Sequence, residues 1–253
     1  MAKIIAIVNQ KGGVGKTTTS INLAAYLAQD GKPTLLIDAD PQANATSGIG
    51  TGQESVRNTV YDIFTKDIHP LSAVSLTGVR GLHVVPSTPD LSAAEIELVN
   101  IPSREYILKK SLDKVRNNYH YILIDCPPSL GLITVNALTA SDKVIIPIQT
   151  EYYALEGLGK LLKTITLIKR SLNPQLEIGG ALMTMHDKRM KLSRSVTEEV
   201  RKHFPGPVFD TIIPRNVKLA EAPSFGKSIF SYDLFSPGAR AYKNLAREVQ
   251  KNV

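Results

Sequence analysis

The chain has 253 residues, of which 43% are hydrophobic and 21% charged, proportions typical of a globular protein with a substantial core. No apolar run approaches the roughly 18 residues of a membrane span, and the N-terminus lacks the cleavage site of a signal peptide. The single cysteine, Cys126, excludes an internal disulfide framework or a cysteine-rich metal site. These features predict a soluble cytoplasmic protein.

The formal net charge of +7 is unevenly distributed. Residues 1–159 hold 13 basic and 15 acidic side chains, residues 160–227 hold 13 and 6, and residues 228–253 hold 4 and 2. The excess therefore lies almost wholly in 160–227. Charge alone leaves two interpretations open, a solvated lysine-rich face or an anion-binding surface.

Short apolar runs alternate with amphipathic segments along the whole chain. Strands are expected at 4–8, 34–38, 82–86, 121–125, 143–148, 178–184 and 208–213. Helices are expected at 16–29, 103–117, 130–140, 155–172, 190–203 and 237–251. Apolar runs of this kind are typical of parallel strands buried on both faces. The pattern predicts one α/β domain over residues 1–253, with a mostly parallel twisted sheet and helices on both faces.

The stretch "NQKGGVGKTT" joins the first expected strand to the first expected helix. Gly12, Gly13 and Gly15 would let backbone N–H groups converge on phosphate oxygens. Lys16 would reach the β- and γ-phosphates, and the Thr17 hydroxyl would bind Mg²⁺. Strand, glycine-rich turn and helix together predict a P-loop NTPase.

The P-loop departs from its usual pattern at its start. A glycine would stand at position 10, but Gln10 occupies it, and a second lysine, Lys11, follows. One lysine is enough to bind the phosphates of a nucleotide within a single subunit. The second lysine therefore requires a separate explanation.

Acidic side chains follow two expected strands. "YILID" ends in Asp125, and "TLLIDAD" ends in Asp38 and Asp40, which are separated by one residue. In an extended chain that spacing directs both carboxylates to the same side. The carboxylate at 125 is suited to the water shell of a metal ion, and one of the earlier pair to orienting a water molecule. Cys126 is expected to be a buried packing residue.

Five segments together resemble the ParA/Soj family of chromosome-partitioning ATPases. They are "KGGVGKTT", "DADPQAN", "IDCPPSLG", "EYYALEGL" and "IPRNVKLAEAPSFGKSI". The resemblance covers the whole chain and implies an ATP- and Mg²⁺-dependent ATPase that forms a nucleotide sandwich homodimer. Because a strand is expected at residue 4, no added N-terminal DNA-reading domain is expected.

The resemblance also implies roles for individual residues. Lys11 would reach across the dimer to the partner's ATP, as an arginine finger does in other NTPases, and Gly12 would lie where the subunits approach closely. The catalytic residues would be Lys11, Lys16 and Asp40. The metal would be held by Thr17, Asp38 and Asp125. Nucleotide contacts would come from Lys11, Gly12, Gly13, Val14, Gly15, Lys16, Thr17, Thr18, Pro214, Arg215 and Asn216.

Arg189 and Lys218 match basic positions with which this family binds DNA, and both fall in the charge-rich segment. The resemblance thus implies non-specific double-stranded DNA binding in the ATP state, a nucleoid-associated location, and segregation of a chromosome or plasmid. Hydrolysis would be weak alone and stimulated by a ParB-type centromere-binding partner.

Relatives with the same loop do other work. A MinD-like membrane-cycling ATPase is the principal alternative, but its C-terminal amphipathic targeting helix has little counterpart in "GARAYKNLAREVQKNV". A nitrogenase-type iron protein would need more cysteines than Cys126. The absence of CxxC disfavours an arsenite or tail-anchored-protein carrier.

Overall fold

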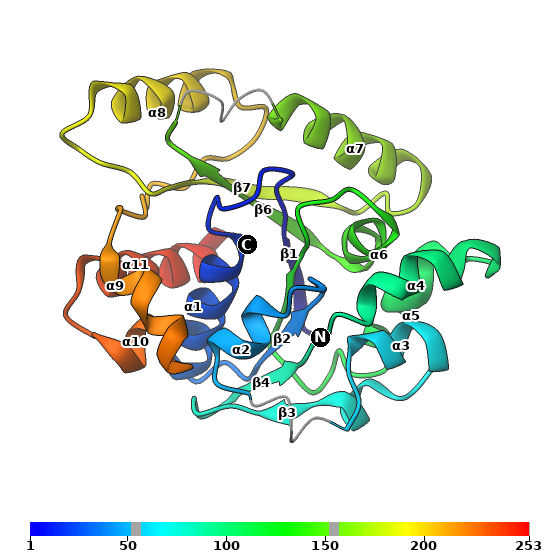
Figure 1. Ribbon diagram of the computed structural model, residues 1–253. Helices are drawn as coiled ribbons and strands as arrows, with labels where there is room; N and C mark the ends of the chain where they lie inside the picture. Colours follow the sequence, from blue (N-terminus) through cyan, green and yellow to red (C-terminus); the bar gives the residue numbers. More distant parts are fainter. Residues whose placement is uncertain (52–56, 152–156, 253) are drawn as a thin grey trace.

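The computed structural model describes residues 1–51, 57–151 and 157–252. A sheet runs through its centre in the order β3-β4-β2-β5-β1-β6-β7 (Figure 1). Neighbouring strands are parallel except for β3, which pairs antiparallel with β4. The strands are β1 (Lys3–Ile7), β2 (Thr34–Asp38), β3 (Ser75–Leu76), β4 (Leu82–Val85), β5 (Tyr121–Asp125), β6 (Lys143–Gln149) and β7 (Glu177–Thr184).

Helices cover both faces of the sheet (Figure 1). One face carries α1 (Lys16–Gln29), α2 (Asn44–Gly48), α9 (Val217–Glu221), α10 (Ile229–Tyr232) and α11 (Pro237–Asn252). The other carries α3 (Val60–Lys66), α4 (Leu91–Glu97), α5 (Ile107–Asp113), α6 (Leu132–Ala140), α7 (Leu158–Ser171) and α8 (Lys191–His203). The predicted α/β fold, with a mostly parallel sheet between two helical layers, is confirmed.

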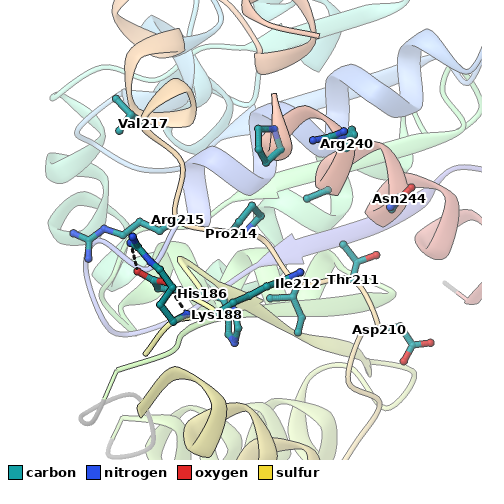
Figure 2. A pocket seen from close by; sticks show the side chains of 14 residues that line it. His186, Lys188, Asp210, Thr211, Ile212, Pro214, Arg215, Val217, Arg240 and Asn244 are labelled. Atoms are coloured by element: carbon teal, nitrogen blue, oxygen red, sulfur yellow. Dashed lines mark hydrogen bonds and ion pairs between the residues drawn. The ribbon is translucent and has the colours of Figure 1, made fainter. Parts of the chain in front are cut away.

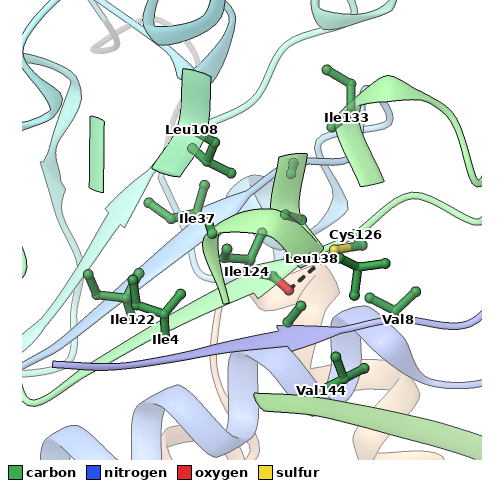
Figure 3. Close-up of a cluster of buried hydrophobic side chains, with 14 of the residues drawn as sticks. Ile4, Val8, Ile37, Leu108, Ile122, Ile124, Cys126, Ile133, Leu138 and Val144 are labelled. Carbon is green, nitrogen blue, oxygen red and sulfur yellow. Dashed lines mark hydrogen bonds between the residues drawn. The ribbon is translucent and has the colours of Figure 1, made fainter. Parts of the chain in front are cut away.

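Alternation along the central strands explains the two layers. Ile4 and Ala6 of β1 face the α3–α8 layer, whereas Ile5 and Ile7 face the layer containing α1 and α11. Figure 3 shows the first of these cores, where strand side chains meet Leu108 of α5 and helix α6. Burial of apolar surface on both faces stabilises the sheet, whose strand β1 leads into the glycine-rich loop at the carboxyl edge.

Most predicted elements are confirmed, with one strand wrong. The described backbone of segment 208–213 pairs with β7 through an isolated bridge from Val208 to Ala181 and a hydrogen bond from the Ile213 N–H to the Met183 carbonyl. Between these points the N–H groups of Asp210 and Thr211 donate to the carboxylate of Glu248 on α11. Because these N–H groups donate to a helix side chain, they are not available to pair with β7 as a strand.

Several short elements were not predicted: β3, α2, α3, α4, α9 and α10. Each of these helices has seven residues or fewer, too short for a clear apolar period. The predicted helix 155–172 corresponds to α7, and its expected start at 155–156 lies outside the described residues, as does most of the "EYYALEGL" segment.

Two glycines bring distant parts of the chain into backbone contact. Gly50 follows α2, and Gly226 follows the short 3-10 helix Ala222–Phe225; both have positive φ, 81° and 62°. A Cβ on Gly50 would lie 2.7 Å from the Gly226 carbonyl oxygen, and one on Gly226 would lie 2.7 Å from Gly50 Cα. Only glycine at both positions permits this crossing.

We predict that Gly226→Ala lowers the free energy of unfolding by about 1–3 kcal/mol, because a left-handed backbone and a blocked Cβ position are both imposed on alanine. Urea denaturation followed by circular dichroism measures the change. Gly159→Ala is the matched control, since outside its own helix no described residue has an atom within 4 Å of its Cβ position on α7. Equal stability of the two variants would contradict the close crossing.

Candidate nucleotide-binding site

The loop after β1 is fastened to the neighbouring strands by buried side chains. Asn9 donates from Nδ2 to the Pro147 carbonyl on β6 (2.7 Å) and accepts from the Lys11 N–H (3.0 Å). Thr184, at the end of β7, donates from its hydroxyl to the Val14 carbonyl (2.8 Å). The loop therefore has both of its halves tied to the sheet edge. Asn9 and Thr184 were not singled out from the sequence.

The loop forms an open cradle at the start of α1. Among the described residues, no atom lies within 4 Å of the Cβ positions of Gly12 and Gly13. Gly13 and Gly15 have φ values of 72° and 89°, which glycine adopts without strain. Gly15 caps α1 without a side-chain acceptor, so the first N–H groups of the helix can bind an anion.

Lys16 curls back over this cradle. Its side chain is 6% exposed, and Nζ donates to the Lys11 carbonyl at 3.2 Å. Burial lowers the pKa of the ammonium group, and the charges of Asp125 and Asp40 oppose that shift. A buried cation that has only one carbonyl acceptor among the described residues can take up an anionic ligand without losing an ion pair.

Two buried carboxylates lie side by side because β2 and β5 pair in register with Asp38 opposite Asp125. Asp125 accepts a hydrogen bond from Ser20 Oγ on α1 at 2.8 Å through Oδ1. Its other oxygen, Oδ2, is buried and has no hydrogen-bond partner among the described residues. Burial, with the neighbouring Asp38 charge second, raises the pKa of Asp125.

Asp38 is more fully engaged. Its Oδ2 accepts from both the N–H and the hydroxyl of Thr46 at 2.7 Å, and its Oδ1 accepts from the Asp40 N–H at 3.2 Å. Burial raises the pKa of Asp38, while the Thr46 hydrogen bonds oppose the shift. Asp40 instead reaches the cradle, with Oδ1 accepting from Gln42 N–H at 3.0 Å.

The donor set fits Mg²⁺ when a nucleotide completes it. No group of three or more metal-ligating side chains occurs in the described parts of the chain. Magnesium commonly uses one or two carboxylates together with phosphate oxygens and water. The unpartnered oxygen of Asp125 and the hydroxyl of Thr17, which lines the cradle, supply that kind of ligand.

Two cavities meet at the loop. The first, about 520 Å³, lies over the cradle and includes Asp40 in its wall. The second, about 320 Å³, is lined mainly by apolar groups and by segment 213–217. Gly15, Thr18 and Met185 line both, so together they form one path with a polar and an apolar end. Met185, with a φ of 50°, was missed because its place depends on tertiary structure.

The residues predicted to bind the nucleotide and metal fall into four groups. The polar cavity gathers Gly12, Gly13, Gly15, Lys16, Thr17, Thr18 and Asp40; the apolar cavity takes Pro214, Arg215 and Asn216. Val14, Asp38 and Asp125 lie buried behind these walls. Lys11 lines neither cavity, and its Nζ lies 3.7 Å from Glu151. Asn216, which lines the apolar cavity, also has a buried Oδ1 without a hydrogen-bond partner in the described chain.

The basic residues Arg189 and Lys218 line neither the polar nor the apolar cavity. Arg189 has an 89% exposed side chain and lines a larger groove next to the apolar cavity. Arg215 lines the same groove (Figure 2). Lys218 lies on α9 and is exposed. Each has an acidic partner, Asp187 at 2.8 Å and Glu221 at 2.9 Å.

Comparisons with known proteins agree with this geometry. Residues 2–178 match the model of a family described as AAA domain. The sporulation initiation inhibitor protein Soj of Bacillus subtilis is 57% identical over 252 residues, covering 100% of both chains. The chromosome partitioning protein ParA of Myxococcus xanthus is 53% identical, covering 99% of this chain and 89% of the relative.

Solved structures share the fold over nearly the whole chain. Cobyrinic acid a,c-diamide synthase from Mycobacterium smegmatis, with bound ADP and magnesium, has a TM-score of 0.88 at 36% identity, covering 99% of this chain and 95% of the other. The septum site-determining protein MinD of Pyrococcus horikoshii, complexed with Mg-ADP, has a TM-score of 0.81 at 26% identity, covering 99% and 97%. On sequence and fold together, this chain belongs to the ParA/Soj family of chromosome-partitioning ATPases.

Proposed function

We propose that this protein hydrolyses ATP with Mg²⁺ in the joined cavities. The β- and γ-phosphates lie over the cradle, where Lys16 and the first amides of α1 receive them. Thr17, with Asp38 and Asp125 behind it, would hold Mg²⁺, which would supply positive charge to the phosphate oxygens. Asp40, at the cavity wall, orients the attacking water. The adenine occupies the apolar cavity, which has the free acceptor of Asn216 at its side.

The second lysine supports a nucleotide-dependent homodimer. Lys11 is adjacent to the cradle but outside its cavity, and its side chain is 36% exposed. Its one ion pair among the described residues, with Glu151, is long and solvent-exposed, so little free energy is lost when it is exchanged. Lys11 can therefore leave its own subunit and bind the phosphates of a partner's ATP. Gly12, exposed and without a side chain, permits that close approach.

The proposal that ATP controls DNA binding rests on a chain segment that lines both the apolar cavity and the large groove. Pro214, Arg215 and Val217 line the apolar nucleotide cavity on one side and the large groove containing Arg189 on the other. A nucleotide that fixes this segment also fixes a wall of the basic groove. Contacts from Arg189 and Lys218 to phosphates would bind duplex DNA without reading its sequence.

The biological task that follows is segregation of a chromosome or plasmid, by a protein that is cytoplasmic and nucleoid-associated. Turnover is slow alone and stimulated by a ParB-type centromere-binding partner. A MinD-like membrane cycle is less favoured, because Tyr242, Leu245 and Val249 of α11 are buried against the core rather than available to lipid. Among the described helices, none has the length and apolarity needed to cross a bilayer.

Binding of unrelated duplexes with ATP, with ADP and without nucleotide tests the proposal. We expect retention only with ATP, at similar strength for every duplex and with steep weakening as salt rises. Arg189→Glu should abolish retention while leaving ATP binding intact, because it leaves two carboxylates together at positions 187 and 189. Retention independent of nucleotide, or a strong preference for one duplex, would contradict the proposal.

The two loop lysines are separated by a second experiment. Lys11→Ala should bind ATP at near wild-type affinity, since its side chain lies outside the cavity, yet remain monomeric and inactive. Gly12→Val should do the same through steric exclusion at the subunit contact. Light scattering with ATP, alongside phosphate release, measures both properties. A full ATP-dependent dimer in both variants would exclude the sandwich arrangement.

A further inference from the structure

A groove of about 1160 Å³ adjoins the apolar cavity (Figure 2). We call it the cationic groove. Three segments form it: the turn after β7, the irregular segment before α9, and the first half of α11. Its lining residues are His186, Asp187, Lys188, Arg189, Asp210, Thr211, Ile212, Pro214, Arg215, Val217, Pro237, Arg240, Ala241 and Asn244.

Helix α11 contributes two polar side chains that the sequence alone did not single out. Arg240 and Asn244 are four residues apart, so they lie on the same side of the helix, and both are exposed. The opposite side of α11, with Tyr242 and Leu245, is buried. Arg240 forms no ion pair with any described residue, so its guanidinium is available to a ligand.

The groove is held open by a fixed connection between two of its walls. Glu248 of α11 accepts the N–H groups of Asp210 (2.7 Å) and Thr211 (3.1 Å) through its two carboxylate oxygens. This is the same contact that keeps segment 208–213 from forming a strand. It fastens the wall that contains Asp210 and Thr211 to α11, the helix that contributes Arg240 to the groove.

The charge balance of the groove favours an anion. Four cations line it, Lys188, Arg189, Arg215 and Arg240, against the two carboxylates Asp187 and Asp210. Hydrogen bonds from Arg189 lower the pKa of Asp187 to about 2, so that carboxylate is charged and neutralises its partner. Lys188, Arg215 and Arg240 are free of ion pairs within the described chain and outnumber the remaining acid.

We infer that Arg240 and Asn244 bind the phosphodiester backbone of duplex DNA along the cationic groove. The inference rests on the proposed DNA binding and adds α11 to the surface that performs it. The guanidinium can pair with a phosphate through two parallel N–H donors, and the Asn244 amide can donate to the next phosphate or sugar oxygen. Arg189 must first exchange Asp187 for a phosphate, whereas Arg240 has no such competitor in the described structure.

A matched pair of charge reversals tests the inference. Arg240→Glu and Arg247→Glu alter the same helix by the same charge, and Arg247 is exposed but does not line the groove. Binding of one unrelated duplex is measured with ATP across a salt series. We expect Arg240→Glu to weaken binding by about tenfold or more and to flatten the salt slope by about 0.9 for each phosphate that the variant no longer binds. Arg247→Glu should stay close to wild type.

Arg240→Ala should lie between wild type and Arg240→Glu, and circular dichroism and ATP titration should show all variants folded and nucleotide-bound. Equal affinities and slopes for Arg240→Glu and Arg247→Glu would overturn the role of α11 while leaving DNA binding itself in place. Failure of both wild type and Arg247→Glu to bind DNA with ATP would overturn the proposed function as well.

Discussion

Two aspartates from adjacent parallel strands, buried side by side at the carboxyl edge of the sheet, impose the main constraint on this molecule. The register of β2 against β5 sets Asp38 opposite Asp125, and β1, on the other side of β5, leads into the glycine-rich loop. Burial raises the pKa of both carboxyl groups, and the charge of Asp38 raises that of Asp125 further. Hydrogen bonds from Ser20 and Thr46 and the nearby ammonium of Lys16 offset part of the repulsion between the two carboxyl groups.

That arrangement also makes the edge receptive to a metal and an anion together. The helix N-terminus and Lys16 favour negative charge, and the unpartnered oxygen of Asp125 favours positive charge. Mg·ATP carries both. The register of the sheet therefore places at one edge the negative and positive groups whose charges Mg·ATP complements.

The segment 213–217 connects the region at this edge of the sheet to the surface groove. It walls the apolar nucleotide cavity and the cationic groove, and Glu248 fastens the chain just before it to α11. The segment is therefore a short physical route between the apolar cavity and the cationic groove. The Gly50–Gly226 crossing provides a second connection, because it joins the region after α2 to the chain that follows α9. Both routes are contacts between segments far apart in sequence.

The sequence predicted the elements whose signals are local. Helix α1 and strands β2 and β5 have their expected bounds, since glycines, apolar runs and acidic strand ends mark them. The failed strand at 208–213 depends on Glu248, which lies 38 residues after Asp210 and 37 after Thr211, a separation that no local pattern reveals. The candidate site divides in the same way: the loop residues were predictable from spacing, whereas Met185 and Thr184 join the site only through tertiary packing. Lys218 and Glu221 are three residues apart on α9, a spacing at which an ion pair could have been anticipated. The pair of Asp187 and Arg189, two residues apart in a turn, has no such local rule.

The most direct test of the nucleotide site is titration of a fluorescent ATP analogue with Mg²⁺ into wild type and Lys16→Ala, with folding of both verified by circular dichroism. We expect saturable binding by wild type that weakens when Mg²⁺ is chelated. We expect no measurable binding by Lys16→Ala, because the buried ammonium is the point cation of the cradle. Near-normal affinity in the folded Lys16→Ala protein would contradict the assignment of this sheet edge as the nucleotide site.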